Sequence, residues 1–82
     1  MQNLIQNIDK IHTTQMGLAR IIKNIGIYRQ NSYSEIINFC REIINNPSTK
    51  IIIHGKNYYI ELNDIILTIN RHSFTIITAH KK

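Results

Sequence analysis

The C-terminal part of the chain, residues 50–79, contains four short runs of β-branched and aromatic residues. Three dipeptides separate the runs: Gly55-Lys56, Asn63-Asp64 and Arg71-His72. Runs of this composition, interrupted at such short intervals, are typical of strands joined by tight hairpins. Glycine suits the first position of a type II′ turn, and Asn and Asp tolerate left-handed backbone. The segment therefore predicts a four-stranded antiparallel meander.

Two-residue turns fix a register, because side chains alternate between the two faces of a strand. The register pairs Ile53 with Tyr58, Leu62 with Ile65, Ile60 with Leu67, Ile69 with Phe74, and Leu67 with Ile76. These residues share an apolar face with Ile51 and Thr78. The other face takes His54, Asn57, Tyr59, Glu61, Thr68, Asn70, Ser73 and Thr75, together with Ile52, Ile66, Ile77 and Ala79. We expect the functional site on this mixed face.

The residues before the meander have helical periodicity. Apolar residues recur at helical spacing within 4–11 and again within 18–25, and Thr13 or Thr14 is placed to cap the second of these segments. Gly26 suits the end of that helix. The pair Ser32 and Glu35 forms a capping-box pattern before a wide apolar stripe over 36–44, which Pro47 ends.

Helices followed by a meander predict a single α+β domain over residues 1–82, with a helical layer (1–46) and a β-meander (50–79). Two to three N-terminal helices would pack on one face of the four-stranded antiparallel sheet. The chain has 82 residues and is 43% hydrophobic and 18% charged, values that suit a small globular domain. Apolar residues on the uncovered face predict a homodimer or a larger symmetric oligomer.

Charge and cysteine content narrow the possible partners. The net charge of +5 favours anionic ligands or merely keeps an isoleucine-rich protein in solution. The single cysteine, Cys40, lies in an apolar helical pattern, which predicts a buried thiol and suits a reducing cytoplasm. The N-terminus lacks the pattern of a signal peptide, and no apolar run approaches the ~20 residues that span a bilayer. We expect a cytoplasmic protein without a membrane partner.

The sequence lacks the residue patterns of metal sites and of glycine-rich nucleotide loops. The four histidines have no paired spacing and one cysteine makes no zinc motif, so no metal site or other cofactor is predicted. No glycine-rich phosphate loop occurs. Tyr28, Tyr33, Tyr58 and Tyr59 are available to stack on a base. The predicted ligand-binding residues are cations for phosphate, an aromatic ring for a base, and polar side chains that orient the ligand by hydrogen bonds: Arg20, Lys56 and Arg71, then Tyr59, then Thr68, Asn70 and Thr75. His54 and Glu61 are the candidates for proton transfer.

The chain resembles an uncharacterised family of short bacterial and phage proteins, domain-of-unknown-function family thirty-seven eighty-one. The resemblance covers almost the whole chain and rests on the segments 7–14, Arg20-Ile21 with Asn24, 55–59, 66–70 and 74–81. Its specific parts are Gly-Lys-Asn-Tyr-Tyr (55–59) and the pattern of Thr-Ile-Asn (68–70) with Ile-Thr-Ala (77–79). It implies no activity. It does single out polar positions within the family pattern: Thr14, Arg20, Lys56, Asn57, Thr68, Asn70 and Thr78.

The sequence favours a binding protein over an enzyme. The leading hypothesis is a small basic protein that binds a nucleotide or a short RNA, including a signalling nucleotide sequestered by a phage or mobile-element protein. In this hypothesis Lys56, Arg71 and Arg20 hold phosphate and Tyr59 stacks on the base. One alternative is a metal-independent ribonuclease, since the element order is similar to the small RNases of the RelE, barnase and colicin type. The other alternative is a protein–protein inhibitor.

Overall fold

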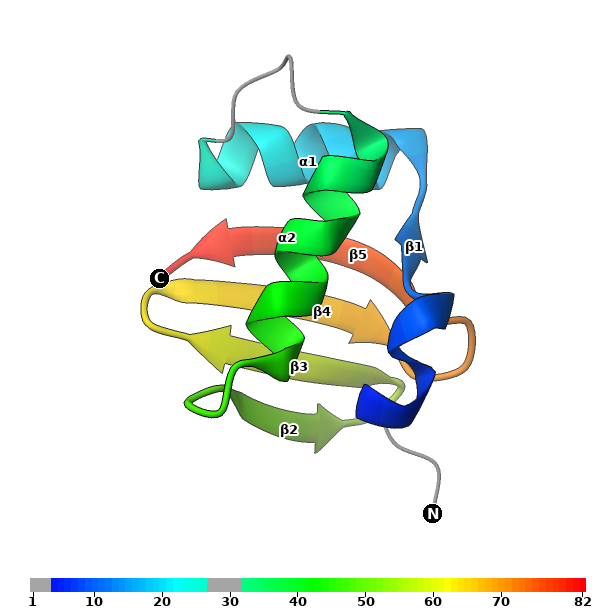
Figure 1. Ribbon diagram of the computed structural model, residues 1–82, viewed down its shortest axis with the longest axis vertical. Coiled ribbons are helices and arrows are strands. Elements are labelled where there is room, and N and C mark those ends of the chain that lie inside the picture. Colours follow the sequence, from blue (N-terminus) through cyan, green and yellow to red (C-terminus); the bar gives the residue numbers. More distant parts are fainter. Residues whose placement is uncertain (1–3, 27–31) are drawn as a thin grey trace.

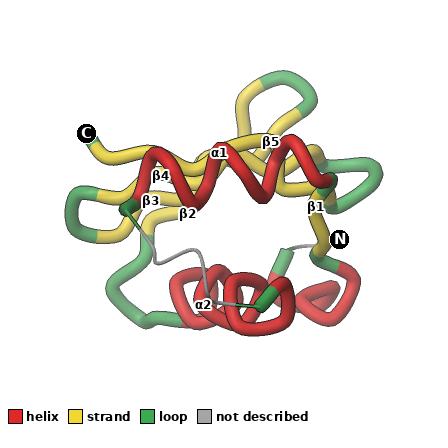
Figure 2. Tube along the Cα trace, turned by 90° about the horizontal axis from the view of Figure 1, so that it is seen from above, coloured by secondary structure: helices red, strands yellow, loops and turns green. Residues whose placement is uncertain are grey.

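The computed structural model describes residues 4–26 and 32–82 and has helices on a five-stranded sheet (Figure 1). The elements in chain order are η1 (Ile5–Lys10), β1 (His12–Thr13), α1 (Gln15–Ile25), α2 (Tyr33–Asn45), β2 (Lys50–His54), β3 (Asn57–Leu62), β4 (Ile65–Asn70) and β5 (Thr75–Lys81). The strand order is β1-β5-β4-β3-β2. Figure 2 shows α2 in a separate layer below the sheet, and α1 lies along β5. The predicted α+β class is confirmed.

The prediction of four antiparallel strands is wrong, because β1 is a fifth strand and runs parallel to β5. His12 lies beside Thr75 and Thr13 beside Ile76. The His12 N–H donates to Phe74 O at 3.3 Å, and the Thr13 hydroxyl donates to Ile76 O at 2.8 Å. A strand of two residues is too short to show an alternating pattern. Its pairing depends on residues more than 60 positions away, so local sequence does not reveal it.

The predicted caps of α1 are confirmed. The Thr14 hydroxyl accepts from the Gly17 N–H at 3.0 Å, and Gly26 ends the helix with φ +80°. Gly17 serves a different purpose, since a Cβ atom there would lie 2.1 Å from Thr13 Oγ1 and 3.1 Å from Ile76 O. Glycine thus allows α1 to approach β1 and β5 closely. The first predicted helix, over residues 4–11, is a 3₁₀ helix, η1.

The capping box of α2 is also confirmed. The Ser32 hydroxyl accepts from the Glu35 N–H, and the Glu35 carboxylate accepts from the Ser32 N–H at 2.9 Å. Hydrogen bonding to the Glu35 carboxylate, first from the backbone and then from the side chain of Ser32, holds the pKa of Glu35 below its ordinary value. The helix ends before Asn46 and Pro47, as predicted. Its first residue, Tyr33, is thereby fixed beside β1.

The first two predicted hairpins are confirmed and the third is wrong. β2–β3 and β3–β4 pair in the predicted register around two-residue turns, and Gly55 has φ +62°. The β4–β5 connection is instead the four-residue segment 71–74, and the ladder carries a bulge. Ile69 therefore pairs with Ile76 instead of Phe74, and Leu67 pairs with Ala79 instead of Ile76. As a result Ala79 is buried on the helix side, and Thr78 lies opposite Thr68.

The wide β4–β5 loop has a local cause in Asn70. Its side-chain Oδ1 accepts from the His72 N–H at 2.9 Å and from the Ser73 N–H at 3.0 Å. Asparagine commonly nucleates turns in this way, by bonding to backbone groups a few residues ahead. Phe74 takes φ +58° and is 7% exposed, so it closes the loop against the core.

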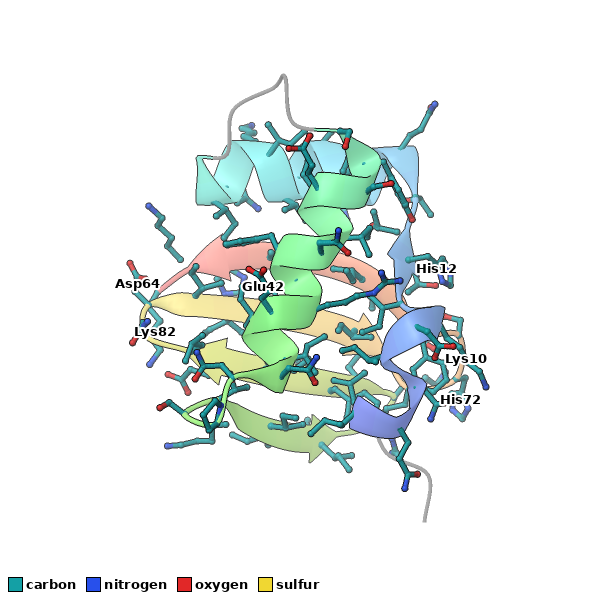
Figure 3. All side chains as sticks on the ribbon, viewed as in Figure 1. Lys10, His12, Glu42, Asp64, His72 and Lys82 are labelled. Carbon is teal, nitrogen blue, oxygen red and sulfur yellow. The ribbon has the colours of Figure 1, made fainter. Side chains whose placement is uncertain are left out.

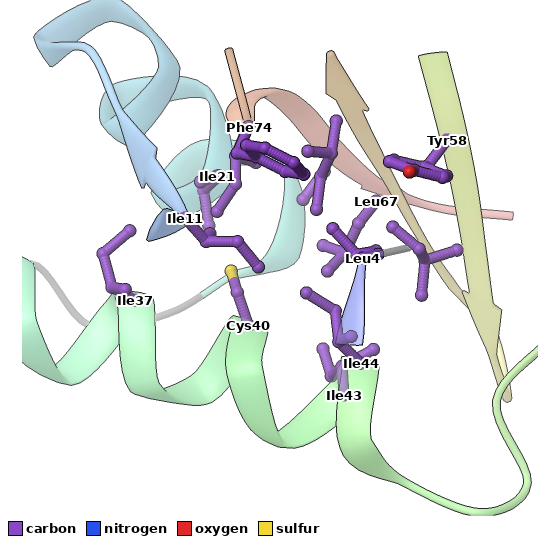
Figure 4. Close-up of a cluster of buried hydrophobic side chains, with 14 of the residues drawn as sticks. Leu4, Ile11, Ile21, Ile37, Cys40, Ile43, Ile44, Tyr58, Leu67 and Phe74 are labelled. Atoms are coloured by element: carbon purple, nitrogen blue, oxygen red, sulfur yellow. The ribbon is translucent and has the colours of Figure 1, made fainter. Parts of the chain in front are cut away.

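The core lies between α2 and the sheet (Figure 4). The buried face of α2 consists of Ile36, Ile37, Cys40, Ile43 and Ile44. The strands contribute Tyr58, Ile60, Leu67, Ile69, Ile76 and Ala79, while η1 and α1 are anchored by Leu4, Ile11, Ile21 and Ile25. The opposite face of the sheet carries the mixed polar and apolar side chains, as the sequence predicts for β2, β3 and β4.

Candidate functional site

Cationic side chains gather where β2 and β4 end and where β1, β3 and β5 begin. We call this edge the loop end of the sheet. It carries Lys10, His12, His54, Lys56, Arg71 and His72, and Figure 3 shows three of these six together. Of the five acidic residues in the chain, only Asp9 is close to this set in sequence. The others lie on α2 (Glu35, Glu42), in β3 (Glu61) and in the opposite turn (Asp64). The loop end therefore carries more basic than acidic side chains.

A continuous row of hydrogen bonds crosses the loop end from β1 to β4. His12 Nδ1 lies 2.9 Å from Lys10 O, and its Nε2 lies 3.0 Å from Thr75 Oγ1. Thr75 Oγ1 lies 2.7 Å from Ser73 Oγ, and the Ser73 hydroxyl donates to Asn70 Oδ1 at 3.2 Å. The row thus joins an imidazole ring, two hydroxyl groups and an amide from two segments of the chain, 10–12 and 70–75.

The Lys10 carbonyl oxygen, at one end of the row, determines which atom of His12 donates. A carbonyl oxygen only accepts, so His12 Nδ1 carries a proton toward Lys10 O. With a neutral ring, the Thr75 hydroxyl donates to His12 Nε2 and Ser73 donates to Thr75 in place of Asn70, because two hydroxyl groups supply only two protons. A ring with both nitrogens protonated donates to Thr75, so that Thr75 donates to Ser73 and Ser73 to Asn70. The direction of the Thr75 hydroxyl therefore depends on the protonation of His12. Such a pair suits either anion binding or proton transfer.

Arg71 joins the two loops at this end. Its Nη1 group donates to Gly55 O at 2.9 Å, and its backbone N–H donates to Lys56 O at 2.8 Å. The β2–β3 turn and the β4–β5 loop are therefore held side by side. Lys56 is exposed in that turn, so its ammonium group extends from a braced backbone.

Four of the seven predicted ligand-binding residues meet at the loop end: Lys56, Asn70, Arg71 and Thr75. The other three do not. Arg20 is exposed on α1, which packs on β5 and so lies across the sheet from Lys56. Thr68 is buried in the middle of β4, opposite Thr78 and Tyr59. Tyr59 lies in β3 near the His54 ring, with centroids 6.4 Å apart.

The two residues predicted for proton transfer are far apart along the sheet. His54 pairs with Asn57, whereas Glu61 pairs with Lys50, four residues further along β2. At about 3.3 Å per residue this corresponds to roughly 13 Å. Glu61 also forms an ion pair with Lys82. This spacing does not suit two groups that act on one phosphodiester bond.

Sequence reasoning left His12 out of the predicted site because β1 was not predicted. The only available signal was the β-branched pair Thr13-Thr14 after a histidine, and it was assigned to a helix cap. Ser73 was placed on the mixed face, but its bonds to Asn70 and Thr75 depend on the wider loop. Both residues reach the site through β5, because His12 lies beside Thr75 and Ser73 bonds to Thr75.

The tyrosines also differ from the prediction in their roles. Tyr58 is 6% exposed and belongs to the core, and Tyr28 lies outside the described residues. Tyr33, at the start of α2, is 42% exposed. Its hydroxyl accepts from the Thr13 N–H at 2.9 Å and donates to Thr13 O at 3.3 Å. Tyr33 therefore binds the outer edge of β1 and leaves much of its ring open to solvent.

Within residues 4–26 and 32–82, no group of three or more His, Cys, Asp or Glu side chains is arranged to bind a metal ion. In the same part of the chain, no helix has the length and apolar character needed to cross a membrane.

Fold and site together define a small α+β domain that has a mixed five-stranded sheet and a basic, hydrogen-bonded loop end. The chain belongs to the family described as Protein of unknown function (DUF3781), whose model matches residues 5–80. No curated protein and no solved structure matches it.

Proposed function

We propose that this protein is a small basic binding protein for a phosphate-bearing ligand, a nucleotide or a short RNA, and that the ligand binds at the loop end. The observation that carries the proposal is that Lys56, Arg71 and His12 lie at the same end of the sheet as the hydroxyl groups of Ser73 and Thr75. Phosphate oxygens accept strong hydrogen bonds from charged donors and from hydroxyl groups. The net charge of +5 would add long-range attraction for such a ligand.

Three finer predictions belong to the same proposal. The ligand is a signalling nucleotide, and the protein is a phage or mobile-element protein that sequesters it. The protein is cytoplasmic, where a lone thiol such as Cys40 stays reduced. It is a homodimer or larger oligomer, because Ile52 and Ile53 in the edge strand β2 are 49% and 52% exposed.

Replacing Lys56 with alanine tests the binding site. We expect Lys56→Ala to weaken binding of a labelled short RNA or nucleotide by about fivefold to tenfold at low salt, because one phosphate contact is lost. The slope of log affinity against log salt should fall by about one. Fluorescence polarisation over a salt series measures both quantities. Lys23→Ala is the matched control, since Lys23 is an exposed lysine in the last turn of α1. Equal losses in both variants would indicate diffuse charge without a site, and absent binding would reject the proposal.

A metal-independent ribonuclease is a second candidate, favoured by the His12–Thr75–Ser73 row. In this alternative His12 transfers a proton at the 2′-oxygen and a loop-end cation stabilises the charge that develops. Incubation of labelled RNA in EDTA, followed by a denaturing gel, tests this alternative. Fragments that appear with the natural protein and are lost with His12→Ala would favour cleavage. Fragments lost with His54→Ala or Glu61→Ala would instead support the residues predicted from the sequence.

The protein–protein inhibitor is favoured by a different feature, the free edge of β2. Among the described residues β2 pairs only with β3, so its other edge presents exposed isoleucine side chains and backbone groups that a partner chain could use to extend the sheet. Intact RNA without any shift on a native gel, together with no nucleotide binding, would favour the inhibitor over both ligand-based proposals.

A further inference from the structure

A polar cavity lies between β1 and α2, next to the loop end. Its volume is about 360 Å³, and its polar lining is His12 from β1 with Tyr33, Ser34, Asn38 and Arg41 from α2. Ser34, Asn38 and Arg41 follow one another at helical spacing, so they share one side of α2. Ile11 and Ile37 supply the apolar part of the lining. Small-molecule sites are concave and use converging polar groups to orient the ligand, and this cavity supplies such groups.

Tyr33 gives this cavity a fixed aromatic surface. The two hydrogen bonds between its hydroxyl and the Thr13 backbone hold the ring in place, yet the residue is 42% exposed. Exposed aromatic rings accept a nucleobase by stacking, and a ring already held in position loses little freedom when it does so. The ring therefore has the features of a stacking surface.

The polar groups of the cavity suit a neutral heterocycle better than a second phosphate. The Arg41 guanidinium already donates to Ile8 O at 3.1 Å, to Asp9 O at 3.4 Å and to Asn38 Oδ1 at 3.3 Å. Its charge is thus engaged in holding the end of η1. The Ser34 hydroxyl and the Asn38 amide are neutral, and groups of this kind bond to the donors and acceptors at the edge of a base.

His12 connects the cavity to the loop end. His12 is one of the residues that line the cavity, and its Nε2 contacts Thr75 Oγ1 at 3.0 Å in the hydrogen-bonded row. Figure 3 shows His12 on the same side of the molecule as Lys10 and His72. One molecule can therefore reach both places if its base occupies the cavity and its phosphates extend past His12. A volume of about 360 Å³ accommodates one base and does not accommodate an oligonucleotide.

We propose that this cavity is the base subsite of a mononucleotide site, with Tyr33 as the stacking surface and with Ser34 and Asn38 bonded to the edge of the base. This inference rests on the proposed function, because the phosphates are those held at the loop end. It assigns the ligand to nucleotides and not to longer RNA. It also moves the stacking role from Tyr59 to Tyr33.

The test compares ligands that share a phosphate chain and differ in the base. Binding of ATP, GTP, CTP, UTP and inorganic tripolyphosphate is measured by calorimetry. We expect at least one nucleotide to bind about tenfold or more tightly than tripolyphosphate, as stacking of one base predicts. Tyr33→Leu should abolish that excess, and Tyr33→Phe should keep most of it because the ring remains. Lys56→Ala should weaken nucleotide and tripolyphosphate alike.

Changes at Tyr33 remove the hydroxyl that bonds to the β1 backbone, so a second variant tests the cavity without altering that contact. Asn38→Leu keeps the size of the side chain and removes its amide, and it should reduce nucleotide binding while tripolyphosphate binding stays unchanged. Equal affinity for nucleotides and tripolyphosphate would overturn the base subsite and leave the phosphate site standing. Undiminished nucleotide binding in folded Tyr33→Leu and Asn38→Leu would also overturn it. If neither ligand class binds, the proposed function falls together with the subsite.

Discussion

Replacing Leu67 with alanine is expected to lower the free energy of unfolding by about 3 kcal/mol, within the usual range for a buried leucine. Leu67 is 0% exposed in β4, between the strand partners Ile60 and Ala79. The neighbouring strands are fixed by their own ladders, so they cannot close in on the missing methyl groups. Equilibrium unfolding in urea measures the loss, and an unchanged slope against urea would show that the unfolded state is not altered.

The adjacent residue provides a control that tests the assignment of the two faces. Ile66 has a similar volume, but it lies on the opposite face of β4 and is only partly buried. We expect Ile66→Ala to cost about 1 kcal/mol, because much of its apolar surface is still in contact with water. Equal losses for the two variants would contradict a sheet that is covered by helices on one face only.

The hairpins and caps were predictable because their causes are local. Gly55 sets one turn, Asn63-Asp64 set the next, and Ser32 with Glu35 marks the start of α2. In each case the residues that determine the geometry lie within a few positions of one another. The register around Ile60 followed from these turns. It was therefore correct for the strands that the turns connect.

The errors arose where distant residues decide the structure. β1 forms because His12 and Thr13 pair with Thr75 and Ile76 of β5. Gly17 allows α1 to approach β1 and β5 closely. The third turn looked like a dipeptide, but Asn70 bonds to the backbone ahead of it and widens the loop. The candidate site depends on both features. For this reason the sequence predicted Lys56, Asn70, Arg71 and Thr75, but it missed the contribution of His12.

Cys40 leads to the second large expected effect, a loss of stability at alkaline pH. Burial raises the pKa of its thiol from 9.0 to about 12, because the charged thiolate is disfavoured away from water. As the pH rises above 9.0, the unfolded chain loses the thiol proton while the folded chain keeps it. The thiol therefore does not lower the free energy of unfolding below pH 9.0. Above pH 9.0 this free energy falls by about 1.4 kcal/mol per pH unit as the pH rises toward the folded-state pKa.

Urea unfolding at pH 8.0, 9.5 and 10.5 compares the natural protein with Cys40→Ala. Tyrosine and lysine residues titrate in both proteins, so only the difference between the two pH profiles reports on the thiol. Alanine leaves a small cavity with a constant cost, and hence the variant should begin less stable and lose less stability as the pH rises. The gap should narrow by about 1 to 2 kcal/mol over this range. Parallel profiles would show that Cys40 ionises as readily in the folded protein as in the unfolded chain, and thus that it does not lie in the dry core between α2 and the sheet.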